Sequence, residues 1–204
     1  QGGKMHGLIN RSIQCFLRDT YGAGAWVQVV RGAGLGFDSF EAMLTYDPVL
    51  TDAVLDAATQ LLGRSRDSIL EDLGSYLVSH PNMHGLRRLL RFGGTTYADF
   101  LQSLEDLPGR ARLALPDADL LALDLRDRSP TDYTLFCRSD LSGAGHVLVG
   151  ILRAMADDYG ALSVVDHRGQ TPDGQEEIAI TLAEGAFSAG RSFDLAQNVA
   201  APRW

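Results

Sequence analysis

The feature that most constrains the fold is a change of hydrophobic period at Pro116. Before this residue, apolar side chains recur every three or four positions, as they do along one face of a helix. After it, short segments rich in β-branched and aromatic residues are bounded by Gly, Pro, Asp and Ser, which is typical of strands. A run of helices followed by strands predicts an α+β fold and not a doubly wound parallel sheet.

Helical segments are expected throughout the first part of the chain, and most of them stop at glycine or before proline. They cover residues 6–22, 25–34, 47–63, 65–80 and 83–94. A further helix is expected to start at a capping box formed by Thr96 and Asp99 and to run through Pro108. Its apolar spacing is helical, yet a proline inside a helix costs about 3 kcal/mol. The Pro108–Gly109 pair therefore needs an explanation.

The second part of the chain predicts a β-β-α-β-β order. Strands are expected at residues 118–127, 131–139, 161–169 and 176–185, with a helix at residues 142–160. We expect one domain with a helical lobe at about residues 5–95 and a mixed lobe at about residues 96–185 that holds a four-stranded antiparallel sheet and helices. A cleft where two such lobes meet is a common ligand site. Residues 1–4 are interpreted as a tag remnant, and residues 186–204 as a tail that links or docks.

Composition excludes several functions. The chain carries 26 acidic and 18 basic residues, a net charge of −8, whereas nucleic-acid binding needs a basic surface. No apolar run is long enough to span a bilayer, and no secretory signal is recognisable. Two cysteines make no disulfide framework, so a cytoplasmic location is expected. Enzyme motifs and zinc-ligand spacings are absent from the sequence, so we expect neither a catalytic residue nor a regular metal site.

Four stretches carry a resemblance to a known family. They are MHGLINRSIQCFLRDTYG at residues 5–22, LLRFGGTTYADFLQSLEDL at 89–107, LPDA at 115–118 and YTLFCRSDLSGAGHVLVGILRAMADDYG at 133–160. In this order and spacing they resemble the heme nitric oxide/oxygen-binding (H-NOX) family, which includes the sensor domain of soluble guanylate cyclases. The resemblance spans about residues 5–184. It implies a heme-binding sensor fold in which a histidine of the proximal helix ligates the iron.

The resemblance also implies where the heme contacts would be. Without gaps, the proximal histidine falls on Pro108, and the proline that presses on the porphyrin falls on Leu121. In the Tyr-x-Ser-x-Arg motif that binds the propionates, the tyrosine falls on Cys137, the serine on Ser139 and the arginine on Leu141. Only the serine is kept. This pattern predicts that the family's usual heme ligation is lost, and that the proline pair is tolerated because the ligand is gone.

Other residues leave alternatives open. Fallback iron ligands are His80, His84, His146 and Cys137, although each has an ordinary structural role as its first interpretation. An apolar pocket is expected to be lined by Ile9, Ile13, Leu104 and Leu107 with Leu121 and Leu141. It either collapses into core or holds another hydrophobic ligand, such as a fatty acid or a different tetrapyrrole.

The function class also has alternatives. The resemblance implies a sensor that acts in trans on a signalling partner, such as a cyclase, a diguanylate cyclase or a histidine kinase. The alternatives are a heme-based gas sensor with an unusual ligand and a ligand-free interaction module. The sequence does not indicate an oligomeric state.

Overall fold

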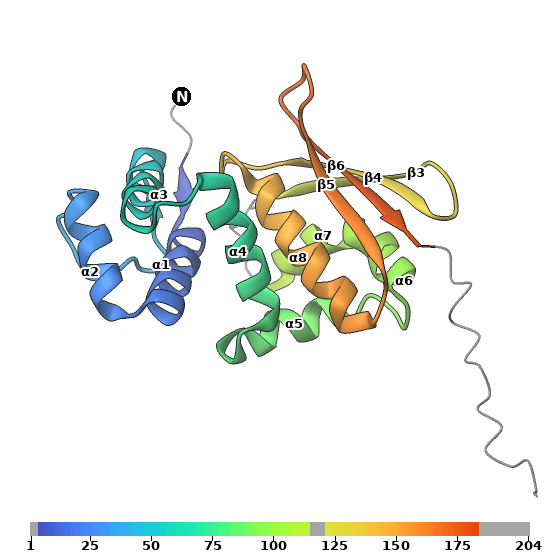
Figure 1. Ribbon diagram of the computed structural model, residues 1–204, viewed down its shortest axis with the longest axis horizontal. Coiled ribbons are helices and arrows are strands. Elements are labelled where there is room, and N and C mark those ends of the chain that lie inside the picture. The colour runs from blue at the N-terminus through green and yellow to red at the C-terminus, as the bar shows by residue number, and fades with distance from the viewer. Residues whose placement is uncertain (1–3, 115–120, 184–204) are drawn as a thin grey trace, which may run out of the picture.

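A computed structural model describes residues 4–114 and 121–183 and confirms the α+β class (Figure 1). The LPDA stretch, the tail and the tag remnant, apart from Lys4, lie outside the described residues. The first five helices follow the expected segments closely. They are α1 Gly7–Tyr21, α2 Ala23–Gly32, α3 Pro48–Leu62, α4 Arg66–Ser79 and α5 His84–Arg91. The 3-10 turn η1, Pro81–Met83, separates α4 from α5.

Local chemistry explains the bounds of these helices, as α3 illustrates. Its N-cap Asp47 accepts a hydrogen bond from the N–H of Val49 at 3.0 Å, and Pro48 occupies the first position, where no N–H donor is needed. The helix ends at Gly63, whose φ of 62° is the left-handed conformation that glycine adopts without strain. A short antiparallel pair, β1 Met5–His6 with β2 Thr45–Tyr46, was not expected from the sequence.

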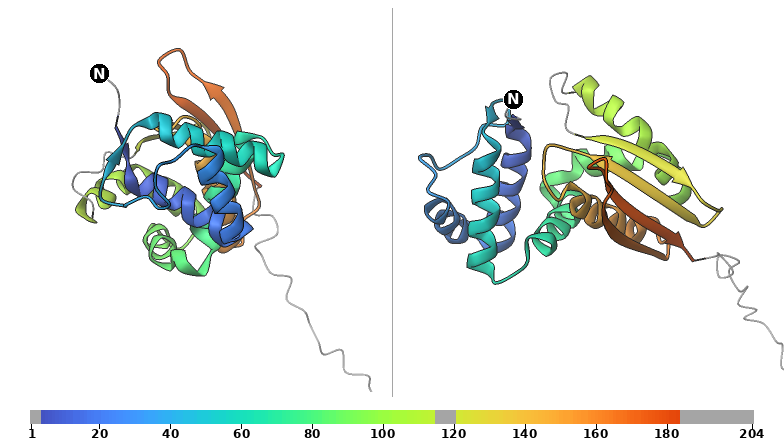
Figure 2. Two further views of the ribbon diagram at one scale, coloured as in Figure 1. Left: turned by 90° about the vertical axis from the view of Figure 1, so that its left-hand side faces the viewer. Right: turned by 90° about the horizontal axis from the view of Figure 1, so that it is seen from above.

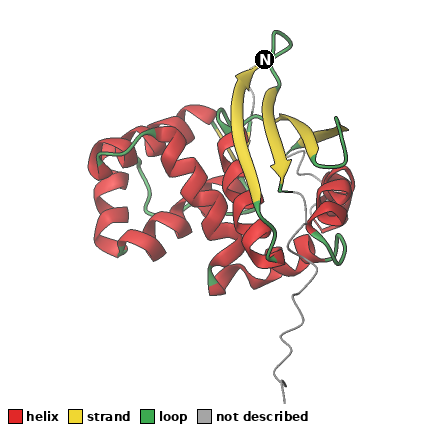
Figure 3. Ribbon diagram, turned by 45° about the vertical axis from the view of Figure 1, so that its right-hand side comes forward, coloured by secondary structure: helices red, strands yellow, loops and turns green. Residues whose placement is uncertain are grey.

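The second part forms one antiparallel sheet in the order β3-β4-β6-β5. The strands are β3 Ala122–Asp127, β4 Asp132–Arg138, β5 Ser163–Gln170 and β6 Glu176–Leu182. Helix α8, Ala144–Tyr159, lies against one face of this sheet (Figures 2 and 3). Every second residue of the central strands belongs to the core beside α8, which is the period of two of a β-strand, and the opposite face of β4 also buries Thr134 and Phe136.

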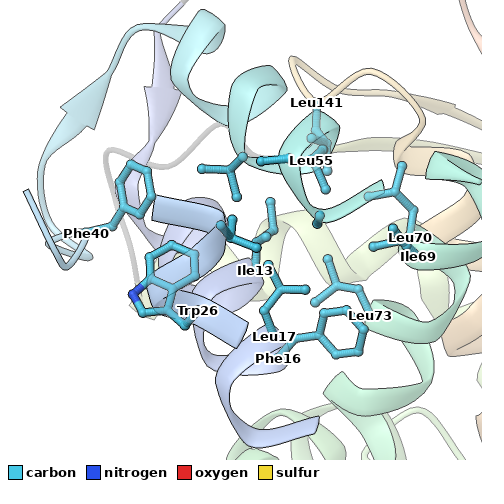
Figure 4. Close-up of a cluster of buried hydrophobic side chains, with 14 of the residues drawn as sticks. Ile13, Phe16, Leu17, Trp26, Phe40, Leu55, Ile69, Leu70, Leu73 and Leu141 are labelled. Atoms are coloured by element: carbon cyan, nitrogen blue, oxygen red, sulfur yellow. The ribbon is translucent and has the colours of Figure 1, made fainter. Parts of the chain in front are cut away.

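Two hydrophobic cores meet at α4. The first joins α1, α2, α3 and α4, with Ile13, Leu17, Leu55 and Leu73 among its buried side chains (Figure 4). The second lies between the sheet, α8 and the helix that begins at residue 97. Helix α4 contributes to both cores, because Val78 near its end belongs to the second. It packs directly on α8, so it is the element that joins the helical lobe to the sheet lobe.

The expectation of one continuous helix through Pro108 is wrong. The chain forms α6, Tyr97–Gln102, then the 3-10 turn η2, Ser103–Asp106, and then a new helix, α7, Leu107–Ala114. Pro108 is the second residue of α7, where its missing N–H has no intrahelical partner to lose. The proline is therefore tolerated because it starts a helix, an ordinary reason that needs no missing ligand.

The capping box at Thr96 is confirmed, and it gives the first prediction. The N–H of Asp99 donates to Thr96 Oγ1 at 3.1 Å, and the N–H of Thr96 donates to Asp99 Oδ2 at 3.0 Å. Thr96→Ala should lower the free energy of unfolding by about 1 kcal/mol, measured by urea denaturation, because a helix donor loses its acceptor. Thr20→Ala, at an exposed position inside α1, is the control and should change little. An equal change in both variants would contradict the capping role.

Candidate functional site

Pro108 and the apolar side chains near it offer packing surface and no ligand atom. Pro108 and Leu107 are half-buried at the start of α7, and Leu121 is half-buried just before β3. Leu104 is buried in the second core, against which Leu107 and Leu121 pack. These four positions therefore contribute apolar surface, and none of their side chains can bind a metal.

Cys137 is held as a thiol. It lies in β4 with 1% of its surface exposed and pairs in register with Leu123 on one side and Glu176 on the other. Burial, followed by the negative charge of Glu176, raises the pKa of the Cys137 thiol to about 12. Because metals bind the thiolate, this environment disfavours Cys137 as an iron ligand.

The other positions of the propionate motif lie just before α8. Ser139 is half-buried, and its Oγ accepts a hydrogen bond from the N–H of Leu141 at 3.2 Å. Leu141 has 6% of its surface exposed and packs in the first core with Ile13, while Ile9 is partly buried against that core (Figure 4). The expected pocket residues thus divide between two cores. Ile9, Ile13 and Leu141 belong with the first, whereas Leu104, Leu107, Leu121 and Cys137 belong with the second.

His80 and His84 flank η1, at the helix break that the sequence indicated. Neither is arranged as a metal ligand. The His80 ring stacks on Tyr76 with centroids 4.7 Å apart, and its Nδ1 accepts a hydrogen bond from the N–H of Asn82 at 3.3 Å. These aromatic rings and Phe16 line a shallow cavity of about 360 Å³ between α1 and α4. His84 is exposed at the first residue of α5.

His146 stands at the centre of a charged cluster that joins three elements. Its Nδ1 lies 3.2 Å from Glu71 Oε1, and its Nε2 lies 3.6 Å from Asp67 Oδ1, both on α4. Its ring stacks on His167 of β5 with centroids 4.1 Å apart. Both nitrogens of His146 therefore face carboxylates, which leaves neither directed toward a heme.

Glu176 completes this cluster and was missed by the sequence analysis. Its Oε2 accepts hydrogen bonds from His167 Nε2 at 2.8 Å and from the N–H of Gly145, in the first turn of α8, at 3.1 Å. Only 7% of the residue is exposed. The sequence did contain a signal that Glu176 is buried. Side chains alternate between the two faces of a strand, so Glu176 shares the core-facing side of β6 with Ile178 and Ile180.

These donors do not fit a heme bound in the way that the resemblance implies. In the alignment that the resemblance implies, Pro108 stands where the proximal histidine would be and the buried Leu141 where the arginine would be, and the fallback ligands are engaged or exposed. Over residues 4–114 and 121–183, no cluster of three or more His, Cys, Asp or Glu has a geometry suited to a metal ion. Within the same ranges, no helix combines the length and apolarity needed to cross a membrane.

Comparisons with known proteins place these observations in a family context. The Haem-NO-binding family profile matches residues 6–166. Soluble guanylate cyclase 89Da of Drosophila melanogaster is 22% identical over 160 residues, which cover 78% of this chain and 24% of the cyclase. Soluble guanylate cyclase gcy-31 of Caenorhabditis elegans is 24% identical over 161 residues, which cover 79% of this chain and 23% of the cyclase. The chain thus spans about a quarter of the length of these relatives.

Solved structures share the fold at low sequence identity. The Fe(II) unliganded H-NOX protein from K. algicida superposes with a TM-score of 0.74 at 16% identity, covering 90% of this chain and 99% of that one. An H-NOX variant from T. Tengcongensis gives a TM-score of 0.72 at 13% identity, covering 90% of this chain and 100% of that one.

Proposed function

The chain belongs to the Haem-NO-binding family, and on this premise we propose that it is a sensor domain that no longer ligates heme through its proximal helix. In its place, the domain binds an apolar molecule between the helical lobe and the sheet lobe. Occupancy changes how the lobes sit on each other, and the change is transmitted to a cytoplasmic signalling partner. The domain itself carries no catalytic role.

The observation that supports this proposal most is the chemistry at Pro108. The proline side chain has no donor atom for iron. Its position in the first turn of α7 is one that proline favours, so the helix is not strained by the absence of a histidine. Leu107, Pro108 and Leu121 all keep part of their surface exposed, which leaves apolar area for a ligand to cover.

The partner is proposed from relatives and not from the site. The fly and nematode proteins that match are guanylate cyclases by name, and the matched part is about a quarter of each. We propose that the sensor acts in trans on a protein of this kind, a cyclase, a diguanylate cyclase or a histidine kinase.

Heme content is the decisive measurement. We expect the protein expressed with added heme precursor to show no Soret absorption band after dialysis, because Pro108 and Leu141 stand where the resemblance places the iron ligand and the propionate-binding arginine. The K. algicida H-NOX protein, treated identically, serves as the positive control for heme loading. A Soret band that survives dialysis at near-stoichiometric intensity would contradict the proposal and favour a heme sensor with an unusual ligand.

Native mass spectrometry of the same sample tests whether the domain binds an apolar molecule. We expect additional mass that dissociates on denaturation and partitions into organic solvent, as an apolar ligand would. A single bare mass that persists after incubation with hydrophobic compounds would favour a ligand-free interaction module.

A further inference from the structure

The helical lobe has a cavity of its own between α1 and α4, with a volume of about 360 Å³. One face of each helix lines it, because residues three or four positions apart lie side by side on a helix. Thr20, Ser75 and Ser79 have short side chains, which leave the space between the helices open. The lining residues are Phe16 and Thr20 of α1, Asp72, Ser75, Tyr76 and Ser79 of α4, and His80 and Pro81 beyond its end.

Aromatic rings form the inner wall of this cavity. The Phe16 and Tyr76 rings meet edge to face with centroids 5.6 Å apart, and both residues are buried. The His80 ring stacks on Tyr76, and 30% of its side chain is exposed. His80 Nδ1 accepts the N–H of Asn82 and so holds no proton, which leaves the ring uncharged in this geometry. Rings of this kind attract cations as well as apolar groups, because their faces carry partial negative charge.

Two carboxylates lie at the cavity, each paired with one arginine. Asp72 lines it directly, and Asp19 lies behind Tyr76, whose hydroxyl donates to Asp19 Oδ2 at 2.7 Å. This hydrogen bond is the main reason why the pKa of Asp19 is below its ordinary value, although burial opposes the shift. Asp19 is therefore ionised near neutral pH. Arg18 pairs with Asp19 and Arg64 with Asp72, so the arginines offset much of the carboxylate charge.

The ends of the two helices add negative charge. Helix α1 ends at Tyr21 and α4 at Ser79, and the bond between Asp19 and Tyr76 joins their last turns. The last carbonyls of a helix lack an intrahelical donor, and the helix dipole places roughly half a negative charge there. Arg18 lies in the last turn of α1, whereas the last turn of α4, a helix described in full, carries no basic residue. The cavity therefore combines aromatic surface with an excess of negative charge.

We propose that this cavity binds a small organic cation, an ammonium ion that carries alkyl groups. Its alkyl groups lie against the aromatic wall, and its charge faces Asp72 and the carbonyls that end α4. A hydrated inorganic cation gains little from apolar walls, and a neutral apolar molecule gains nothing from the charge, so neither matches the whole lining. The site lies within the helical lobe and is independent of the ligand proposed between the lobes.

The first measurement compares choline with 3,3-dimethylbutan-1-ol, which has nearly the same shape but carbon in place of the charged nitrogen. Each is titrated into the full chain, and binding is followed by proton–nitrogen correlation NMR with the amides of Thr20 and His80 as local reporters. Choline should bind at least about tenfold more tightly, because the attraction of the rings and of the negative charge acts on choline alone. Equal affinities would overturn the inference.

Two variants at one position test the charge without disturbing the core. Thr20 lines the cavity and is exposed, and glutamate and lysine are similarly good helix formers, so Thr20→Glu and Thr20→Lys should both fold. Choline should bind about threefold more tightly to Thr20→Glu and about threefold more weakly to Thr20→Lys than to the wild type. The affinity for the neutral analogue should be the same in both. Equal choline affinities in the two variants would contradict the proposal.

Asp72→Asn tests the carboxylate of the lining. It should weaken choline binding about fivefold, because it removes a negative charge and leaves that of Arg64 unbalanced. Asp52→Asn is the matched control, since Asp52 also pairs with an arginine, Arg66, on a helix surface but lies outside the lining. It should keep the wild-type affinity. An equal loss in both variants, or no choline-dependent NMR shift in the wild type, would overturn the inference. Binding of a lysine-containing peptide without binding of choline would overturn it too, in favour of a protein partner.

Discussion

Replacing Gly150 with alanine should destabilise the fold by at least about 4 kcal/mol, or prevent folding, although alanine is the better helix former by roughly 1 kcal/mol. Gly150 lies in α8 where that helix crosses α4. A Cβ atom added there would overlap the carbonyl oxygen of Glu71 and approach the backbone nitrogen of Ser75. Because the obstacle is backbone and not a flexible side chain, relief requires one helix to move.

Helix α4 also has a glycine, Gly74, at the point where it crosses α8. A Cβ atom on Gly74 of α4 would overlap the carbonyl oxygen of Val147, so Gly74→Ala should be comparably damaging. Gly85→Ala is the control, because nothing lies within 4 Å of its Cβ position and the change should be neutral or stabilising. Urea denaturation followed by circular dichroism measures all three. If Gly150→Ala unfolds at the same urea concentration as Gly85→Ala, the close approach of α4 and α8 is wrong.

The sequence indicated most of the helices and the four strands of the sheet, but not the contacts between them. Apolar period, glycine stops and the Thr96–Asp99 capping box are local signals, and the helices and strands that they predicted are present. The break before Pro108 was missed, because the apolar spacing continues across η2 as if the helix were unbroken. The roles of Gly74 and Gly150 were invisible, since each depends on a residue more than 70 positions away.

In the candidate site, too, the sequence indicated the types of residue but not the contacts between them. The resemblance aligned Pro108, Leu121 and Leu141 with the family's heme contacts, and the structure packs Leu121 against the second core and buries Leu141 in the first. The resemblance could not show that these residues divide between two cores, which depends on how the lobes meet. The cluster around His146 and Glu176 was missed because its members come from four elements, α4, α8, β5 and β6. The alternation of side chains along β6 indicated only that Glu176 faces the core.

Supplying the two groups that the resemblance implies should allow the protein to bind heme. Pro108→His supplies an imidazole at the position of the family's iron ligand, and Leu141→Arg supplies a cation for the propionates. Expressed with heme precursor, the double variant should show a Soret band that survives dialysis, whereas the wild type should show none.

The two substitutions should depend strongly on each other. Leu141 has 6% of its surface exposed in the first core, so arginine there without a counter-ion should cost several kcal/mol, about 3 or more. Leu141→Arg alone should therefore have a lower melting temperature and bind no heme. Heme should restore much of the lost stability only when Pro108→His is also present to hold the iron.

Pro108→Ala with Leu141→Arg is the matched control, because it removes the proline without adding a ligand. A Soret band in this control would show that iron is held elsewhere. No band in the double variant, with the protein still folded, would show that the alignment of Pro108 with the iron ligand is wrong or that the space beside it no longer accepts a porphyrin.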